Sequence, residues 1–94
     1  MPTVRQQIID LLTTEELNAM EISQALSIRE REVYDHLLHI SRTLANHGKR
    51  LAITPYACVS CAYSFKERQR FNRPSRCPRC KGGHIRMATY RITS

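Results

Sequence analysis

The chain has 94 residues and a formal net charge of +7, with 41% hydrophobic and 24% charged residues. This length allows one small domain, or a domain with a smaller appendage, and therefore only a limited hydrophobic core. The sequence has no apolar run of about 18 residues and no hydrophobic signal segment at its start, so we expect a cytoplasmic protein that is not bound to a membrane.

Two short helices are predicted in the first third of the chain. Residues 3–12 are expected to form an amphipathic helix, whose apolar positions follow the i, i+4, i+7, i+8 spacing of one helix face: Val4, Ile8, Leu11 and Leu12. Asn18 can cap a second helix, because Glu21 stands three residues later, where its side chain can reach back to the capping residue.

A third helix is predicted from about residue 29 to 46, with a buried stripe at Val33, Leu37, Ile40 and Leu44. A tight turn at Ser27-Ile28 joins it to the second helix, which predicts a helix-turn-helix. Residues 20–37 resemble the helix-turn-helix of many prokaryotic winged-helix regulators. Ser27 stands at the turn position where such proteins usually have Gly, since that residue commonly needs a positive φ.

The third helix supplies candidate contacts to DNA. A recognition helix exposes donors that suit base edges and phosphates, and the candidates here are Arg29, Arg31, His36 and Arg42. The alternative is a solvated face on which the two early arginines pair with Glu30 and Glu32.

Two strands are predicted after the helices. Leu51–Thr54 reads as a strand that Pro55 ends, and alternation at Ala88, Tyr90 and Ile92 predicts another, with a bulge or a change of sheet around 87–88. We expect an α+β fold: residues 1–55 form a winged helix-turn-helix whose wing is completed by about 86–93, and residues 56–85 form a small β ribbon inserted at the wing. The alternative is a ribbon appended after the wing.

All four cysteines lie in two Cys-x-x-Cys pairs, Cys58/Cys61 and Cys77/Cys80, separated by residues 62–76. Two residues between cysteines let the backbone turn so that both sulfurs face one point, and two such turns complete a tetrahedral site. We predict one structural zinc ion held by all four. Iron is the first alternative and paired disulfides the second. A site with four protein ligands has no open position, and the sequence shows no nucleophile–base pair, so we expect no enzymatic activity.

Charge is divided unevenly along the chain. Residues 1–48 contain four Arg and seven acidic residues, whereas residues 49–94 contain eleven Lys or Arg and one acid, Glu67. This basic half suits a polyanion, with nucleic acid the first candidate. We expect the segment Lys66–Arg76 to be an exposed arm. The candidate phosphate contacts are Lys49, Arg50, Lys66, Arg68, Arg70, Arg73 and Arg76.

The two cysteine segments, Cys-Val-Ser-Cys-Ala-Tyr and Cys-Pro-Arg-Cys-Lys-Gly, resemble the double knuckle of rubredoxins, which implies electron transfer as one function. Ala62 and Lys81 stand where rubredoxins have Gly, which we expect to crowd the sulfur geometry, and the basic surface also differs. Both features favour zinc. Tyr63, Phe65 and Phe71 are expected to cover one side of the site.

The whole chain resembles a family of small prokaryotic, largely archaeal, predicted transcriptional regulators in which a winged helix-turn-helix is fused to a rubredoxin-like zinc ribbon. The match rests on Glu21 through Leu37, Gly48 through Leu51, and both knuckles with Pro74 through Pro78. The resemblance implies transcription regulation through DNA binding. The acidic first half favours an alternative, a protein-binding adaptor of the transcription machinery with non-specific nucleic-acid affinity; a rubredoxin-like electron carrier is third. The sequence leaves monomer and homodimer open.

Overall fold

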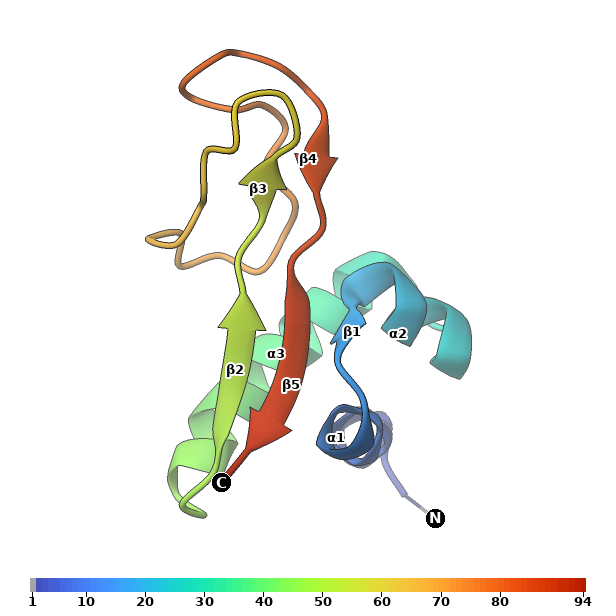
Figure 1. Ribbon diagram of the computed structural model, residues 1–94. Coiled ribbons are helices and arrows are strands. Elements are labelled where there is room, and N and C mark those ends of the chain that lie inside the picture. The colour runs from blue at the N-terminus through green and yellow to red at the C-terminus, as the bar shows by residue number, and fades with distance from the viewer. Residues whose placement is uncertain (1) are drawn as a thin grey trace.

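The computed structural model describes residues 2–94 and confirms a mixed α+β fold. Within these residues the helices are α1 (Val4–Thr14), α2 (Ala19–Leu26) and α3 (Glu30–Ala45). The strands are β1 (Leu17–Asn18), β2 (Arg50–Thr54), β3 (Ala57–Cys58), β4 (Ile85–Arg86) and β5 (Thr89–Thr93). The molecule is elongated, 45 × 28 × 19 Å, because β3, β4 and their loops extend beyond the end of the helical part (Figure 1).

Helix α1 is longer than its apolar pattern predicts. Thr3 caps its start by accepting a hydrogen bond from the Gln6 amide. The helix continues through Thr13 and Thr14, whose hydroxyls donate to main-chain carbonyls one turn back, at 2.7 and 3.1 Å. The end predicted at residue 12 is therefore wrong by two residues, because threonine hydroxyls can bond within a helix as well as interrupt it.

Local hydrogen bonds fix α2 and the turn that follows it. The predicted capping box is confirmed: the Asn18 side chain accepts from the Glu21 amide at 2.8 Å, and the Glu21 carboxylate accepts from the Asn18 amide at 2.9 Å. Ser27 ends the helix at φ 55°, the left-handed conformation expected at this position. The Glu32 carboxylate accepts from the Arg29 amide at the start of α3.

The hydrophobic core lies between the helices and one face of the sheet. The predicted stripe of α3 is buried: Val33, Leu37, Ile40 and Leu44. It packs with Ile8 and Leu12 of α1, Ile22 of α2, and Tyr90 and Ile92 of β5. The helices thus cover one face of the three-stranded sheet and leave the other open (Figure 1).

The larger sheet has the strand order β1-β5-β2, with antiparallel neighbours. The predicted pairing of the two long strands is confirmed, with a register that runs from Arg50 opposite Thr93 to Thr54 opposite Thr89. Strand β1 was not predicted; it pairs with β5 from the other side. Next to it, the Glu16 carboxylate accepts hydrogen bonds from the hydroxyls of Thr89 and Thr54.

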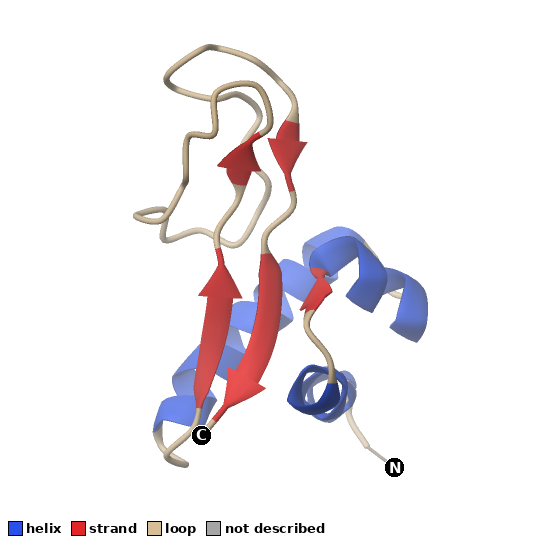
Figure 2. Cartoon of the chain, in the orientation of Figure 1, coloured by secondary structure: helices blue, strands red, loops and turns tan. Residues whose placement is uncertain are grey.

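Residues 55–88, here called the cysteine ribbon, connect β2 to β5. Their only named strands are β3 and β4, which form a separate two-stranded sheet, and the rest is loop and turn (Figure 2). The change of sheet predicted around 87–88 is confirmed, since these two residues separate β4 from β5.

Candidate metal centre and nucleic-acid interface

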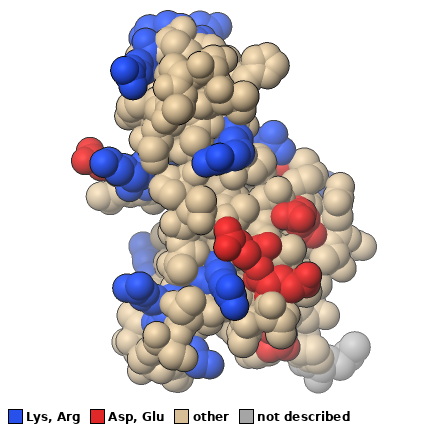
Figure 3. All heavy atoms as spheres, viewed as in Figure 1, with Lys and Arg blue, Asp and Glu red and all other residues tan. Residues whose placement is uncertain are grey.

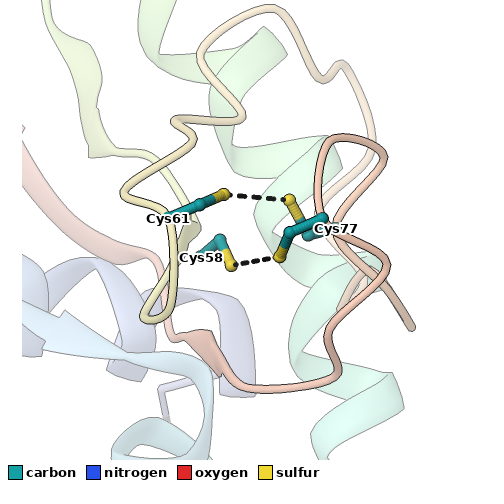
Figure 4. A group of neighbouring side chains, drawn as sticks. Cys58, Cys61 and Cys77 are labelled. Carbon is teal, nitrogen blue, oxygen red and sulfur yellow. Dashed lines mark hydrogen bonds between the residues drawn. The ribbon is translucent and has the colours of Figure 1, made fainter.

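The four cysteine sulfurs converge in the cysteine ribbon, within 4.8 Å of one another. The side chains of Cys58, Cys61 and Cys77 point toward a common centre (Figure 4). Sulfur–sulfur separations between the two pairs are 3.5 Å for Cys58–Cys80 and 3.6 Å for Cys61–Cys77. A tetrahedron of sulfurs about 2.3 Å from a central zinc has edges of ~3.8 Å, whereas a disulfide needs ~2.05 Å. The cluster therefore fits one metal ion and not paired disulfides.

Each cysteine pair is shaped by the same two backbone hydrogen bonds. The amide of the first cysteine donates to the carbonyl five residues later, and the amide four residues later donates back to the first cysteine. These bonds are Cys58 to Tyr63 (2.8 Å) and Ala62 to Cys58 (2.9 Å), then Cys77 to Gly82 (2.8 Å) and Lys81 to Cys77 (2.9 Å). Because the same turn occurs at both cysteine pairs, all four sulfurs point to one centre.

The residue after each pair adopts a left-handed backbone, with φ 62° at Ala62 and 64° at Lys81. The sequence predicts that non-glycine residues there crowd the sulfur geometry; in the structure both side chains are exposed, and both turns form with these residues in place. The backbone comes close to a sulfur at Gly82, where an added Cβ would lie 3.3 Å from the Cys80 sulfur.

The close packing of the thiols pushes the pKa values of Cys58 and Cys61 in opposite directions. The Cys61 amide points at the Cys58 sulfur and lowers the pKa of that thiol to about 7. At Cys61, the Tyr63 amide acts to lower the pKa, but burial and the neighbouring thiols outweigh it and raise the pKa to about 12. Neighbouring thiolates repel one another, and a bound divalent cation would offset that repulsion and favour the ionised form of all four.

The aromatic residues of the ribbon divide between two places. Tyr63 and Phe65 pack edge to face, with ring centroids 5.0 Å apart. Phe71, which the sequence predicts beside the metal site, instead packs against Tyr90 of β5, with ring centroids 5.9 Å apart. Phe71 therefore belongs to the joint between the ribbon and the helical part.

Residues 66–76, the arm, are fastened to α3. Arg73 donates two hydrogen bonds to the Glu30 carboxylate, from Nε at 2.6 Å and from Nη2 at 2.7 Å. Tyr34 donates from its hydroxyl to the same carboxylate. The hydrogen bond from Arg73 is the main reason that the pKa of Glu30 lies below its ordinary value. The arm is exposed over most of its length, as expected, but it is docked on α3. Arg73 is already paired with Glu30 and is therefore not a free phosphate contact.

Two further contacts shape the arm. The Tyr56 hydroxyl, buried at the ribbon end of β2, donates to the Phe71 carbonyl at 2.6 Å. The Arg68 guanidinium donates to the carbonyl and the side chain of Asn72 at 3.0–3.3 Å, so it stabilises the loop of the arm itself. Lys66, Arg70 and Arg76 are exposed, and they have no hydrogen-bond or ion-pair partner within residues 2–94.

The other predicted DNA contacts fall into two groups. Arg29, Arg31, Arg42, Lys49 and Arg50 are exposed at the start, along the length and beyond the end of α3. His36 is half-buried and faces α1, where its Nδ1 accepts a hydrogen bond from Arg5 Nε at 3.3 Å. His36 thus differs from the five exposed cations because it is half-buried and bonded to α1.

Glu30, Tyr34 and Tyr56 hold the arm in place, and sequence reasoning did not identify this role. For Glu30 the sequence offered a misleading signal, because Arg29 and Arg31 are adjacent and Arg73 is 43 residues away. On the face shown in Figure 3, acidic side chains gather near β1 and α2, whereas basic side chains are scattered over the ribbon and the lower left of the view. Within the described residues, no helix is both long and apolar enough to cross a membrane.

These features define a class of protein: a small α+β chain of three helices and antiparallel sheets, with a four-cysteine cluster in the ribbon that connects β2 to β5. Residues 3–52, from α1 into β2, match the family model described as PF0610-like, N-terminal, and the chain belongs to this family.

A solved structure extends the comparison over the cysteine ribbon. The chain is similar to the solution NMR structure of protein PF0610 from Pyrococcus furiosus, with 28% sequence identity and a TM-score of 0.83. The similarity covers 97% of this chain and 89% of that one. No curated protein matches the chain significantly.

Proposed function

We propose that this protein is a DNA-binding transcriptional regulator of the winged helix-turn-helix type. In this interpretation α2 and α3 form the helix-turn-helix, β2 and β5 form the wing, and the cysteine ribbon extends the wing. The observation that carries the proposal is that the basic arm and α3 lie side by side, held together by Glu30 and Arg73. In this arrangement, cationic side chains of the arm and of α3 would contact the same DNA molecule.

The arrangement supports contacts to a nucleic-acid backbone from two elements. Arg70 of the arm lies beside Asp35 and Leu38 of α3, around one shallow surface depression. Arg31 and Arg42 add exposed positive charge along the helix. Phosphate contacts from a helix and an adjoining loop would fix the orientation of the protein on a duplex, while base edges supply any sequence preference.

We propose zinc as the metal and folding as its role. Four thiolates with one Zn²⁺ carry a charge of about −2, which Arg79 and Lys81 next to the cysteines offset. Structural zinc sites of this type supply about 10–16 kcal/mol of apparent binding free energy. A site closed by four protein ligands takes no substrate, so the proposed protein is not an enzyme. One zinc per chain in a colourless protein would support this assignment, and a red, iron-loaded protein would favour the electron carrier.

The test of the main proposal is a DNA titration of the zinc-loaded protein at two salt concentrations, with random and genomic fragments. Arg42→Glu and Arg70→Glu should each weaken binding and reduce the log–log salt slope by about 0.9 for each lost phosphate contact. Arg91→Glu is the matched control, because Arg91 is exposed on β5 between two residues that face the core. If all three variants bind alike, α3 and the arm are not the interface.

A second function is favoured by the same contact between α3 and the arm. The arm partly covers Glu30 and Tyr34 in the first turns of α3, where a helix-turn-helix protein contacts bases, although Arg29 and Arg31 beside them stay exposed. A protein-binding adaptor of the transcription machinery does not need those turns to be accessible. Capture of a stoichiometric transcription protein, together with DNA binding that is equal for all fragments and lost at the higher salt, would select the adaptor.

A further inference from the structure

A cavity of about 220 Å³ lies where the arm meets the ribbon end of the larger sheet. Its sheet side includes Ile53 of β2, Tyr90 of β5 and Tyr56 just beyond β2. Its other side is formed by Phe65 and by residues of the arm as far as Phe71. In Figure 1 this is the region in which the loops of the ribbon pass the end of β2. The cavity is separate from the cysteine cluster, since none of the four cysteines lines it.

The lining combines aromatic and positively charged side chains and contains no negatively charged one. Four aromatic side chains, those of Tyr56, Phe65, Phe71 and Tyr90, contribute to its walls. Three cations, Lys66, Arg68 and Arg70, also line it, and no acidic residue does. The Arg68 guanidinium is already bonded to Asn72. The other two cations are exposed and have no partner within residues 2–94.

The size limits what the cavity can hold. An apolar cavity of ~150 Å³ accepts benzene, so the present volume admits one ring with a small substituent. Apolar walls with a few converging charged groups are typical of small-molecule sites at the junction between two structural units. An anionic substituent is the complement of Lys66 and Arg70, because a charge-assisted hydrogen bond is about twice as strong as a neutral one.

We propose that this cavity binds a small organic anion, namely a single aromatic ring that carries a carboxylate or a phosphate. The ring packs against the aromatic walls, and the anion is bound by Lys66 and Arg70. Because the walls come from both the sheet and the arm, the ligand binds only when the arm is docked and strengthens that docking. This site goes beyond the proposed DNA binding, and its occupancy is measurable without DNA.

The experiment is an NMR titration of the zinc-loaded full chain with benzoate and with phenyl phosphate. Benzyl alcohol supplies the ring without the charge, and inorganic phosphate supplies the charge without the ring. We expect saturable shifts at Phe65–Phe71 and Tyr90 for the two aromatic anions, and binding at least tenfold weaker for each comparator.

Variants test whether the binding is at this cavity. Lys66→Gln and Arg70→Gln should each weaken binding of the aromatic anions by about tenfold. Ile53→Trp, at a half-exposed position of the rim, should block the entrance without disturbing the core. Arg91→Gln removes an exposed cation outside the cavity and should leave the affinity unchanged.

Three outcomes would overturn the proposal: no saturable shifts at these residues, equal binding of inorganic phosphate, or unchanged affinity in Lys66→Gln and Arg70→Gln. A single-stranded oligonucleotide provides the remaining arm of the test. If it alone shifts Phe65–Phe71 and Tyr90, the cavity belongs to a nucleic-acid interface and the small-anion proposal is wrong. A failure of DNA binding with retained binding of the aromatic anions would remove the regulator function and leave this site intact.

Discussion

Ala62 and Lys81 hold the turns that aim the cysteine sulfurs, although neither is glycine. Their φ angles of 62° and 64° lie in the left-handed region, which costs an ordinary residue roughly 1–2 kcal/mol. The backbone hydrogen bonds to Cys58 and Cys77 fix the two turns in spite of this strain. Strain of this kind can be relieved at one position without touching a metal ligand.

Ala62→Gly should therefore raise the free energy of unfolding of the metal-loaded protein by about 1 kcal/mol, because glycine adopts a positive φ without steric strain. Chemical denaturation at a fixed zinc concentration measures the change. Ala57→Gly is the control: Ala57 lies in β3, where glycine should instead destabilise by roughly 0.5–1 kcal/mol. Destabilisation by both substitutions would show that the turn at Ala62 is not strained.

Single residues were predictable where their partners are close in sequence. The cysteine cluster follows from two short spacings, and the capping box of Asn18 and Glu21 spans three residues. Glu30 shows the opposite case. Local reasoning assigns it to neighbouring arginines, and only the folded chain brings Arg73 to it from 43 positions away.

At the scale of elements, the contact between α3 and the arm decides how the ribbon is held. Glu30 receives Arg73 on two oxygens, and the side chains of Glu30 and Arg73 are 22% and 49% exposed. Exposed ion pairs typically contribute 0.2–1 kcal/mol, and a two-point guanidinium–carboxylate contact lies at the upper end of that range. The pair is therefore a modest attachment that helps to orient the arm.

A double-mutant cycle with Glu30→Gln and Arg73→Gln should give a coupling of about 1 kcal/mol at pH 7. Arg73 lowers the pKa of Glu30, so the stabilisation is fully present above the unfolded value, about 4.3, and is lost as pH falls through the lower folded pKa. Unfolding of the zinc-loaded variants measures the coupling. Arg76→Gln removes an unpaired cation of the same arm and should show no coupling to Glu30→Gln; equal coupling would mean that only general charge is involved.

The elements differ in how well the sequence predicts them. Helix α3 was predicted to within one residue at each end, because four apolar positions repeat with helical spacing over a long segment. Strand β1 has two residues, too few for any periodicity, and it forms only because β5 lies beside it. The docking of the arm on α3 has no periodic signal either, since it depends on single contacts between distant segments.

At the scale of the molecule, the order of elements along the chain ties the metal centre to the core. The central strand β5 follows the cysteine ribbon, and its residues Tyr90 and Ile92 are buried against the helices. The ribbon makes up the 34 residues between β2 and β5, and its two cysteine turns meet at the four-cysteine cluster, which keeps this long connection compact. If the ribbon unfolds, β5 pairs with β2 only after closure of a long flexible loop.

Removal of the metal should therefore destabilise the helical part as well as the ribbon. Replacing a turn of about four residues by a flexible loop of this length costs about 2 kcal/mol of closure free energy, which for a domain of this size lowers Tm by roughly 10 °C. Thermal melting followed by helical circular dichroism, with zinc and with a chelator, measures this shift. Cys80→Ser should reproduce the effect of the chelator, whereas Ser60→Ala, at an exposed position between the first two cysteines, should not. A helical transition that is independent of metal would show that the ribbon and the core fold separately, and that the metal does not influence α3.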